Sequence, residues 1–107
     1  MSEAMSPVIV TAYFEPASGK KDALVEVLGE FIPRVHAEQG CELYAIHDAP
    51  DGSIVMIEKW TTLADLEAHA AGAVVAELNV ALQDKLAEPV RVVQLEPLPF
   101  GNARGSL

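Results

Sequence analysis

The chain has 107 residues, half of them apolar, and its 16 acidic against seven basic side chains give a formal net charge of -9. This length suits one domain, and the negative charge argues against a nucleic-acid partner, because a phosphate backbone is bound by a clustered basic face. Cys41 is the only cysteine, so an internal disulfide is excluded and the cytosol is the expected compartment. Residues 1–6 lack the basic and apolar regions of a secretion signal, and no apolar run approaches the ~20 residues of a membrane span, so we expect no membrane partner.

The first predicted elements are a strand and a long helix. The sequence "PVIVTAYFEP" is β-branched and aromatic between Pro7 and Pro16, which is typical of a buried strand. Residues 18–40 then carry apolar side chains at spacings of three and four, which predicts an amphipathic helix. Its apolar stripe consists of Leu24, Val27, Leu28, Phe31 and Val35.

The middle of the chain predicts a β-hairpin. Residues 41–48 and 53–60 are both rich in β-prone side chains, and Asp51-Gly52 between them is a strong turn signal. Alternate residues of a strand point the same way, so Glu58 and Trp60 are expected to share one face of the second strand.

The last third of the chain predicts a broken helix and a final strand. Thr62, with Asp65 three residues on, resembles a capping arrangement for a helix over residues 63–71. Gly72 marks a break before a second helix over residues 73–86. Residues 89–97 then form a fourth strand between two prolines, and residues 98–107 are either a loose tail or an arm that lies on a partner.

These elements follow the order β-α-β-β-α-β, which predicts an α+β fold of the ferredoxin-like type with an antiparallel four-stranded sheet. Residues 8–97 would form this domain, between a flexible N-terminus of residues 1–7 and the tail. The apolar runs "VIV" and "IVMI" do not alternate as they should in a sheet with one wet face. We therefore expect the second face to be covered by another copy of the chain, in a homodimer.

At this point the chain resembles a known family, the antibiotic biosynthesis monooxygenase (ABM) domain. The resemblance is carried by "AEQGCELYAIH" after the long helix, by "IEKWTTLADLEAHAAG" and by "VRVVQLEP". It implies a dimeric α+β barrel and a cofactor-independent oxidation of a quinol, anthrone or catechol type of substrate by O2. Many relatives have a second histidine five residues after the one that matches His69, and here that position is Val74.

The resemblance also allows the haem-degrading branch of this fold to be weighed. That branch would require an asparagine, a tryptophan and a haem-ligating histidine near positions that are here Ala12, His69 and Asn79. None of the three matches, which argues against haem cleavage.

Four residues form the predicted site. His69 would be the general base, because imidazole titrates near neutral pH and the helix register turns this residue inward; a packing role is the alternative. Trp60 would floor an aromatic pocket, or else pack under the following helix with its indole N–H satisfied. Glu58 would need a partner on an apolar face, namely His69, Arg91 or a backbone amide, and structural hydrogen bonding is its alternative role. His47 would orient a substrate oxygen unless it is simply exposed beside the turn.

No cofactor is predicted. Nucleotide-binding glycine motifs are lacking, and His36, His47 and His69 lie on different elements without the spacing of metal ligands. The leading hypothesis is therefore a cofactor-independent monooxygenase. The alternatives are a non-catalytic dimeric module that binds a small ligand, or an isomerase or decarboxylase on the same fold.

Overall fold

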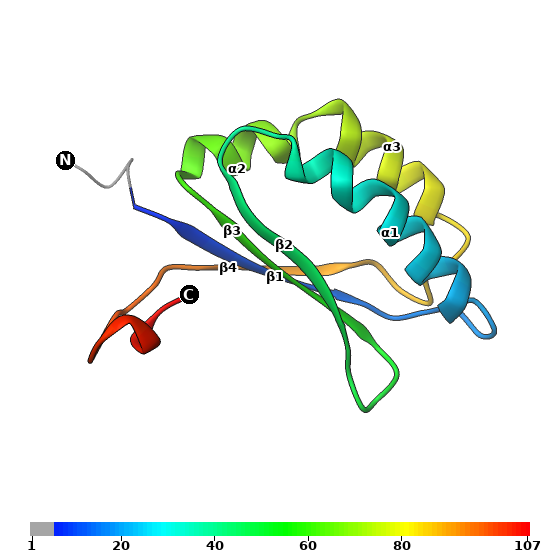
Figure 1. Cartoon of the computed structure of the whole chain (residues 1–107). Helices are drawn as coiled ribbons and strands as arrows, with labels where there is room; N and C mark the ends of the chain where they lie inside the picture. The colour runs from blue at the N-terminus through cyan, green and yellow to red at the C-terminus, as the bar shows by residue number, and fades with distance from the viewer. Residues whose placement is uncertain (1–5) are drawn as a thin grey trace.

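The computed structural model describes residues 6–107. Four strands, β1 (Val8–Phe14), β2 (Cys41–Asp48), β3 (Ile54–Trp60) and β4 (Arg91–Leu95), form one antiparallel sheet in the order β2-β3-β1-β4. Three helices, α1 (Lys21–His36), α2 (Leu63–Ala70) and α3 (Ala73–Leu82), lie together on one face of this sheet (Figure 1). The predicted α+β ferredoxin-like fold is confirmed. No helix within residues 6–107 is long and apolar enough to span a bilayer.

The core lies between the helices and the sheet. Alternation places Val10, Ala12 and Phe14 of β1 on the helix-facing side, where the long helix α1 contributes Leu24, Leu28 and Val35. From β3, Ile54, Met56, Glu58 and Trp60 face the same way and are all buried. The prediction that Glu58 and Trp60 share a strand face is therefore confirmed.

Local signals set most element boundaries. Asp51 Oδ1 accepts hydrogen bonds from the backbone N–H and hydroxyl of Ser53, and Gly52 has φ +94°, so the hairpin turn forms where Asp51-Gly52 predicts it. The hydroxyl of Thr62 accepts a hydrogen bond from the N–H of Asp65 and caps α2, as its sequence pattern predicts.

The prediction of a helix over residues 73–86 is wrong at its end. The helix α3 stops at Leu82, and Leu86 instead forms an isolated antiparallel bridge with Pro16. The N–H of Ala17 donates to the carbonyl of Lys85, and the N–H of Ala87 donates to that of Glu15. These backbone hydrogen bonds join residues 15–17 to residues 85–87, two connecting segments that are far apart in sequence. The helical spacing of apolar residues does not reveal such a pairing. Likewise β4 is shorter than the predicted residues 89–97.

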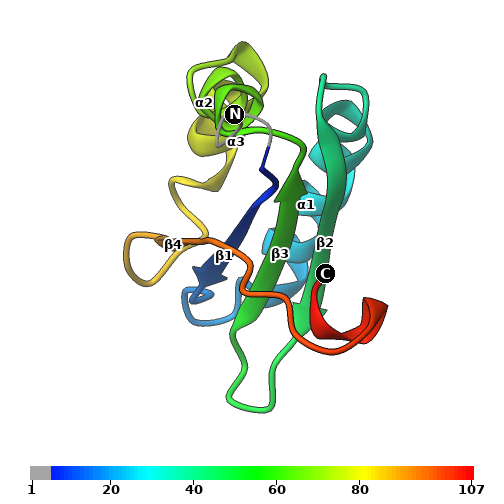
Figure 2. The ribbon, with the colours of Figure 1, turned by 90° about the vertical axis from the view of Figure 1, so that its left-hand side faces the viewer.

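The opposite face of the sheet, which we call the outer face, carries the alternate side chains of each strand and is not covered by α1, α2 or α3 (Figure 2). Near one end of this face Lys59 Nζ donates to the carbonyl of Leu107, so the tail of residues 98–107 turns back toward β3. Thr11, Tyr13, Val55 and Ile57 on the same face are only half-buried.

Candidate functional site

A cavity of about 390 Å³ lies between the helix-facing side of the sheet and the helices α2 and α3. Its volume is within the range of small-molecule sites, which are concave and mostly apolar with a few polar groups. The apolar part of its wall includes Val10, Ala12, Phe14, Leu66, Leu78 and Leu82, and the polar part includes Tyr44, Glu58, Glu67, His69, Asn79 and Gln94. The cavity is thus an apolar pocket with a limited set of groups that can bind or ionise.

The strand register arranges four of the lining residues in one row across the sheet. Tyr44 pairs with Glu58, Glu58 with Val10, and Val10 with Gln94, so the row crosses all four strands on the helix-facing side. Neighbouring strands are ~4.8 Å apart, which places the backbones of Glu58 and Gln94 about 10 Å from each other. The cavity therefore has hydrogen-bonding groups at two ends of an apolar floor.

Glu58 is held by the indole of Trp60. The Trp60 Nε1–H donates to Glu58 Oε1 at 2.9 Å, and Glu58 is only 7% exposed. Burial raises the pKa of Glu58, while the hydrogen bond from Trp60 and the nearby His69 act in the opposite direction. The prediction that His69, Arg91 or a backbone amide would bond to Glu58 is wrong, because Trp60, the next residue on the same strand face, is the donor; His69 acts on Glu58 through its charge.

Trp60 lies behind the cavity and does not line it. Its ring is fully buried and packs against the imidazole of His69, with ring centroids 4.5 Å apart. The prediction that Trp60 floors the pocket is therefore wrong, and its alternative, packing under the following helix with the indole N–H satisfied, is confirmed. Tyr44 meets the same imidazole edge-on at 5.5 Å. Two aromatic rings thus fix the plane of His69.

His69 does face inward from α2, as the helix register predicts, and it lines the cavity. Its Nδ1 lies 2.7 Å from Oε1 of Glu38, in the turn that follows α1. Sequence analysis missed Glu38, because it lies 31 residues from His69 and no local pattern marks it. Within residues 6–107, Nε2 of the imidazole has no hydrogen-bond partner.

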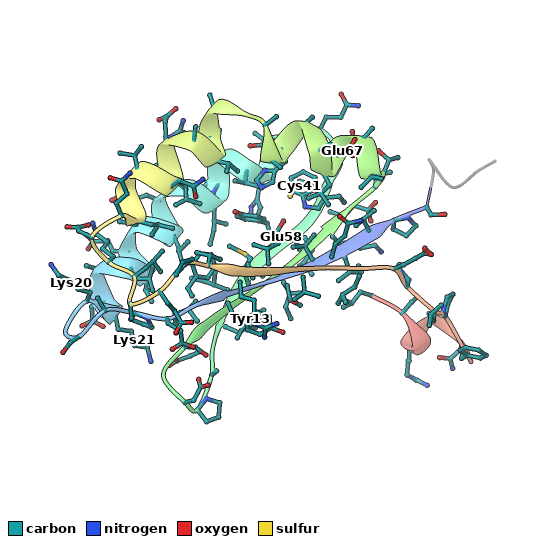
Figure 3. All side chains as sticks on the ribbon, turned by 180° about the vertical axis from the view of Figure 1, so that it is seen from behind. Tyr13, Lys20, Lys21, Cys41, Glu58 and Glu67 are labelled. Atoms are coloured by element: carbon teal, nitrogen blue, oxygen red, sulfur yellow. The ribbon has the colours of Figure 1, made fainter. Side chains whose placement is uncertain are left out.

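His47 is not part of this site. It alternates with Ile46 on β2 and lies on the outer face, where its Nδ1 is 3.2 Å from the carbonyl oxygen of Val55. The sheet therefore separates His47 from His69, and the prediction that both shape one pocket is wrong. Figure 3 shows the same division for two labelled residues, with Glu58 between the sheet and the helices and Tyr13 on the opposite side.

The other positions considered in the sequence lie at different places in the fold, and no metal site is formed among the described residues. Ala12 and Asn79, which were compared with the haem-degrading branch, line the cavity, whereas Val74 lines a second, surface pocket. Nε2 of His36 lies at hydrogen-bond distance, 3.1 Å, from the carbonyl oxygen of Tyr44. Among residues 6–107, no group of three or more His, Cys, Asp or Glu side chains is arranged to hold a metal ion.

Fold and site together define a class of protein, a ferredoxin-like α+β domain with an apolar cavity under its helices and a histidine in the cavity wall. The family described as "Antibiotic biosynthesis monooxygenase" matches residues 7–79. The chain belongs to this family, and the resemblance seen in the sequence is confirmed.

Two curated relatives carry functional names. The "Putative monooxygenase Rv0793" of Mycobacterium tuberculosis is 30% identical over 99 residues, which cover 92% of this chain and 98% of that protein. The "Probable quinol monooxygenase YgiN" of Escherichia coli is 37% identical over 76 residues, which cover 61% of this chain and 72% of that protein.

Solved structures agree with this assignment. The structure of Rv0793 superposes with a TM-score of 0.83 at 30% identity, over 91% of this chain and all (100%) of that one. The structure of PA3566 from Pseudomonas aeruginosa has a TM-score of 0.79 at 26% identity, over 91% and 99% of the two chains. The described fold is therefore shared with these two solved structures.

Proposed function

We propose that this protein is a cofactor-independent monooxygenase that oxidises a small electron-rich aromatic compound, of quinol, anthrone or catechol type, with O2. Family membership and the names of two relatives support the monooxygenase class. The observation that carries the proposal is the position of His69, a buried imidazole in the wall of a mostly apolar cavity. The apolar wall would shield one side of the reacting ring from water while the imidazole accepts its proton.

The proposed reaction begins when Nε2 of His69 takes a phenolic proton. The resulting anion gives an electron to O2, and the two radicals combine in a carbon–oxygen bond to form a peroxide. Cleavage of the O–O bond leaves one oxygen atom on the ring, and the other departs as water with two hydrogens that came from the substrate. Because the substrate also supplies the two electrons that reduce this second oxygen atom, the reaction needs no external reductant.

The polar row across the sheet suggests how the ring lies. One substrate oxygen would sit near His69 and Glu58, whose carboxyl group is already oriented by Trp60. The ring would then cover Val10, and an oxygen at its far end would reach Gln94. This orientation uses apolar contact for the ring and hydrogen bonds only at its two ends.

Oxygen uptake and quinone formation, measured together with a panel of quinols, anthrones and catechols, test the proposal. We expect one oxygen molecule to be consumed for each substrate oxidised, in protein that has been treated with a chelator and dialysed. Binding of these compounds without oxygen uptake would favour the ligand-binding module. Turnover that continues without O2 would instead favour an isomerase or a decarboxylase.

A further inference from the structure

The contact between Glu38 and His69 goes beyond packing. The two side chains are 24% and 7% exposed, and the 2.7 Å separation of their oxygen and Nδ1 is that of a charge-assisted hydrogen bond. An ionised carboxylate can only accept, so the hydrogen of the neutral imidazole must be on Nδ1. The lone pair that can take a proton is then on Nε2.

The backbone fixes where Glu38 lies. The N–H of Glu38 donates to the carbonyl of Val35 at 2.9 Å, and the N–H of Thr61 donates to the carbonyl of Gly40, also at 2.9 Å. Gly40 has φ +81°, and a Cβ atom at this position would collide with the side chain of Asp65 on α2. The turn is therefore pressed against the helix that carries His69, and glycine is required for this approach.

A second pocket opens on the Glu38 side of the imidazole. It has a volume of about 450 Å³ and is lined by Glu38, Gln39, Asp65, Ala68, His69, Gly72, Ala73 and Val74. His69 lines both this surface pocket and the cavity, whereas Glu38 lines the surface pocket alone. Small solutes can thus approach Glu38 without entering the substrate cavity.

We propose that Glu38 is a positioning residue for His69. It holds the imidazole in the tautomer whose Nε2 can accept the substrate's proton, and its negative charge stabilises the imidazolium that this transfer creates. Glu38 itself keeps its charge, since the proton stays on His69 until it leaves with the reduced oxygen. The catalytic part of this inference rests on the proposed function, whereas the effect on the tautomer does not.

Chemical rescue tests the catalytic part. We expect Glu38→Ala to lower kcat by about 10²-fold, the usual lower scale for loss of acid–base assistance, with little change in KM. Formate or acetate should restore much of this loss, because the surface pocket admits a small carboxylate to the vacated position. Glu42→Ala is the matched control, since the Glu42 carboxylate bonds to the hydroxyl of Thr61 instead of to His69. Its kcat should not change, with or without formate.

Nitrogen-15 NMR of the imidazole tests the tautomer in the resting protein, without any substrate. We expect Nδ1 of His69 to carry the hydrogen in the wild type and in the Glu42→Ala variant. In Glu38→Ala, which leaves Nδ1 without an acceptor, the population should move toward hydrogen on Nε2. An unchanged tautomer in the folded Glu38→Ala variant would overturn the inference, as would an undiminished kcat. If no substrate turns over, the proposed function fails and the tautomer measurement alone decides the role of Glu38.

Discussion

The two faces of the sheet are built from the same strands but have different environments. On the helix-facing side, Glu58 is 7% exposed and accepts a hydrogen bond from an indole, next to an imidazole and in the wall of a mostly apolar cavity. On the outer face, Tyr13 lies half-buried under the guanidinium of Arg91, which is 4.0 Å from the ring centroid. A one-residue step along a strand therefore decides whether a polar side chain lines the cavity or lies on the outer face of the sheet.

The histidines make the comparison concrete. From the sequence, both His69 and His47 are candidates for substrate chemistry, His69 because the helix register turns it inward and His47 because it lies at the end of its strand. His69 is packed between Trp60 and Tyr44 in the wall of the cavity, whereas His47 is an exposed side chain on the outer face. The two histidines thus differ in their surroundings, since His69 lines the cavity and His47 is exposed.

The largest expected effect comes from replacing each histidine in turn. We expect His69→Ala to reduce kcat by ~10²-fold or more in a folded variant, because it removes the proposed base. The matched change His47→Ala should leave kcat unaltered, since the sheet lies between His47 and the cavity. Steady-state oxygen consumption with circular dichroism as the folding control measures both. Equal losses in the two variants would remove the distinction between the faces.

The outer face provides the second prediction, a homodimer formed by packing this face against its counterpart. We expect light scattering at micromolar concentration to give twice the chain mass for the wild type. The variant Ile57→Asp, in the middle of the outer face, should give the mass of one chain, because an unpaired charge cannot be buried in the dimer interface. Val80→Asp is the control, since Val80 is 65% exposed on α3 and away from this face. A wild-type chain that stays monomeric would contradict the proposal.

The third prediction compares an aromatic residue from each face. Trp60→Phe leaves a void and deprives the buried Glu58 of its donor, and we expect it to reduce the free energy of unfolding by about 2–4 kcal/mol. Tyr13→Phe should change this free energy by only ~0.5 kcal/mol, as is usual for a partly exposed position. Denaturant unfolding followed by circular dichroism gives both values, since Trp60 is the only tryptophan and its fluorescence is lost in the variant.

The smallest effect concerns the pH dependence of stability. Because burial raises the pKa of Glu58 in the folded protein, the folded state holds this proton to a higher pH than the unfolded state. The stability gained from this tighter proton binding is fully present below pH 4.5 and is lost as the pH rises through the raised pKa of Glu58. The Glu58→Gln variant retains an acceptor for Trp60 but cannot ionise. Its free energy of unfolding should therefore fall less than that of the wild type as the pH rises through this range. Identical pH profiles for both proteins would show that Glu58 titrates normally.

Much of the secondary structure could be predicted because its signals are local. The strand bounds at residues 41–48 are confirmed, as are the Asp51-Gly52 turn and the Thr62 cap of α2. Each depends on residues only a few positions apart, and their hydrogen bonds form within one turn or hairpin. The end of α3 was missed because the bridge between Leu86 and Pro16 depends on a distant segment.

The sequence by itself determined the fold class, the family, the inward direction of His69 and the shared face of Glu58 and Trp60. The family follows from a resemblance of sequence motifs and the fold class from the order of the elements. The directions of the three side chains follow from periods of 3.6 and 2 residues, which backbone geometry imposes on any helix or strand. Only the tertiary structure decided that Glu38 meets His69, that Trp60 supports the cavity from behind, and that His47 lies across the sheet. These contacts depend on how separate elements pack against one another and on which hydrogen-bonding group lies nearest to a buried polar side chain. The spacing of residues along the chain specifies neither the packing nor the partner.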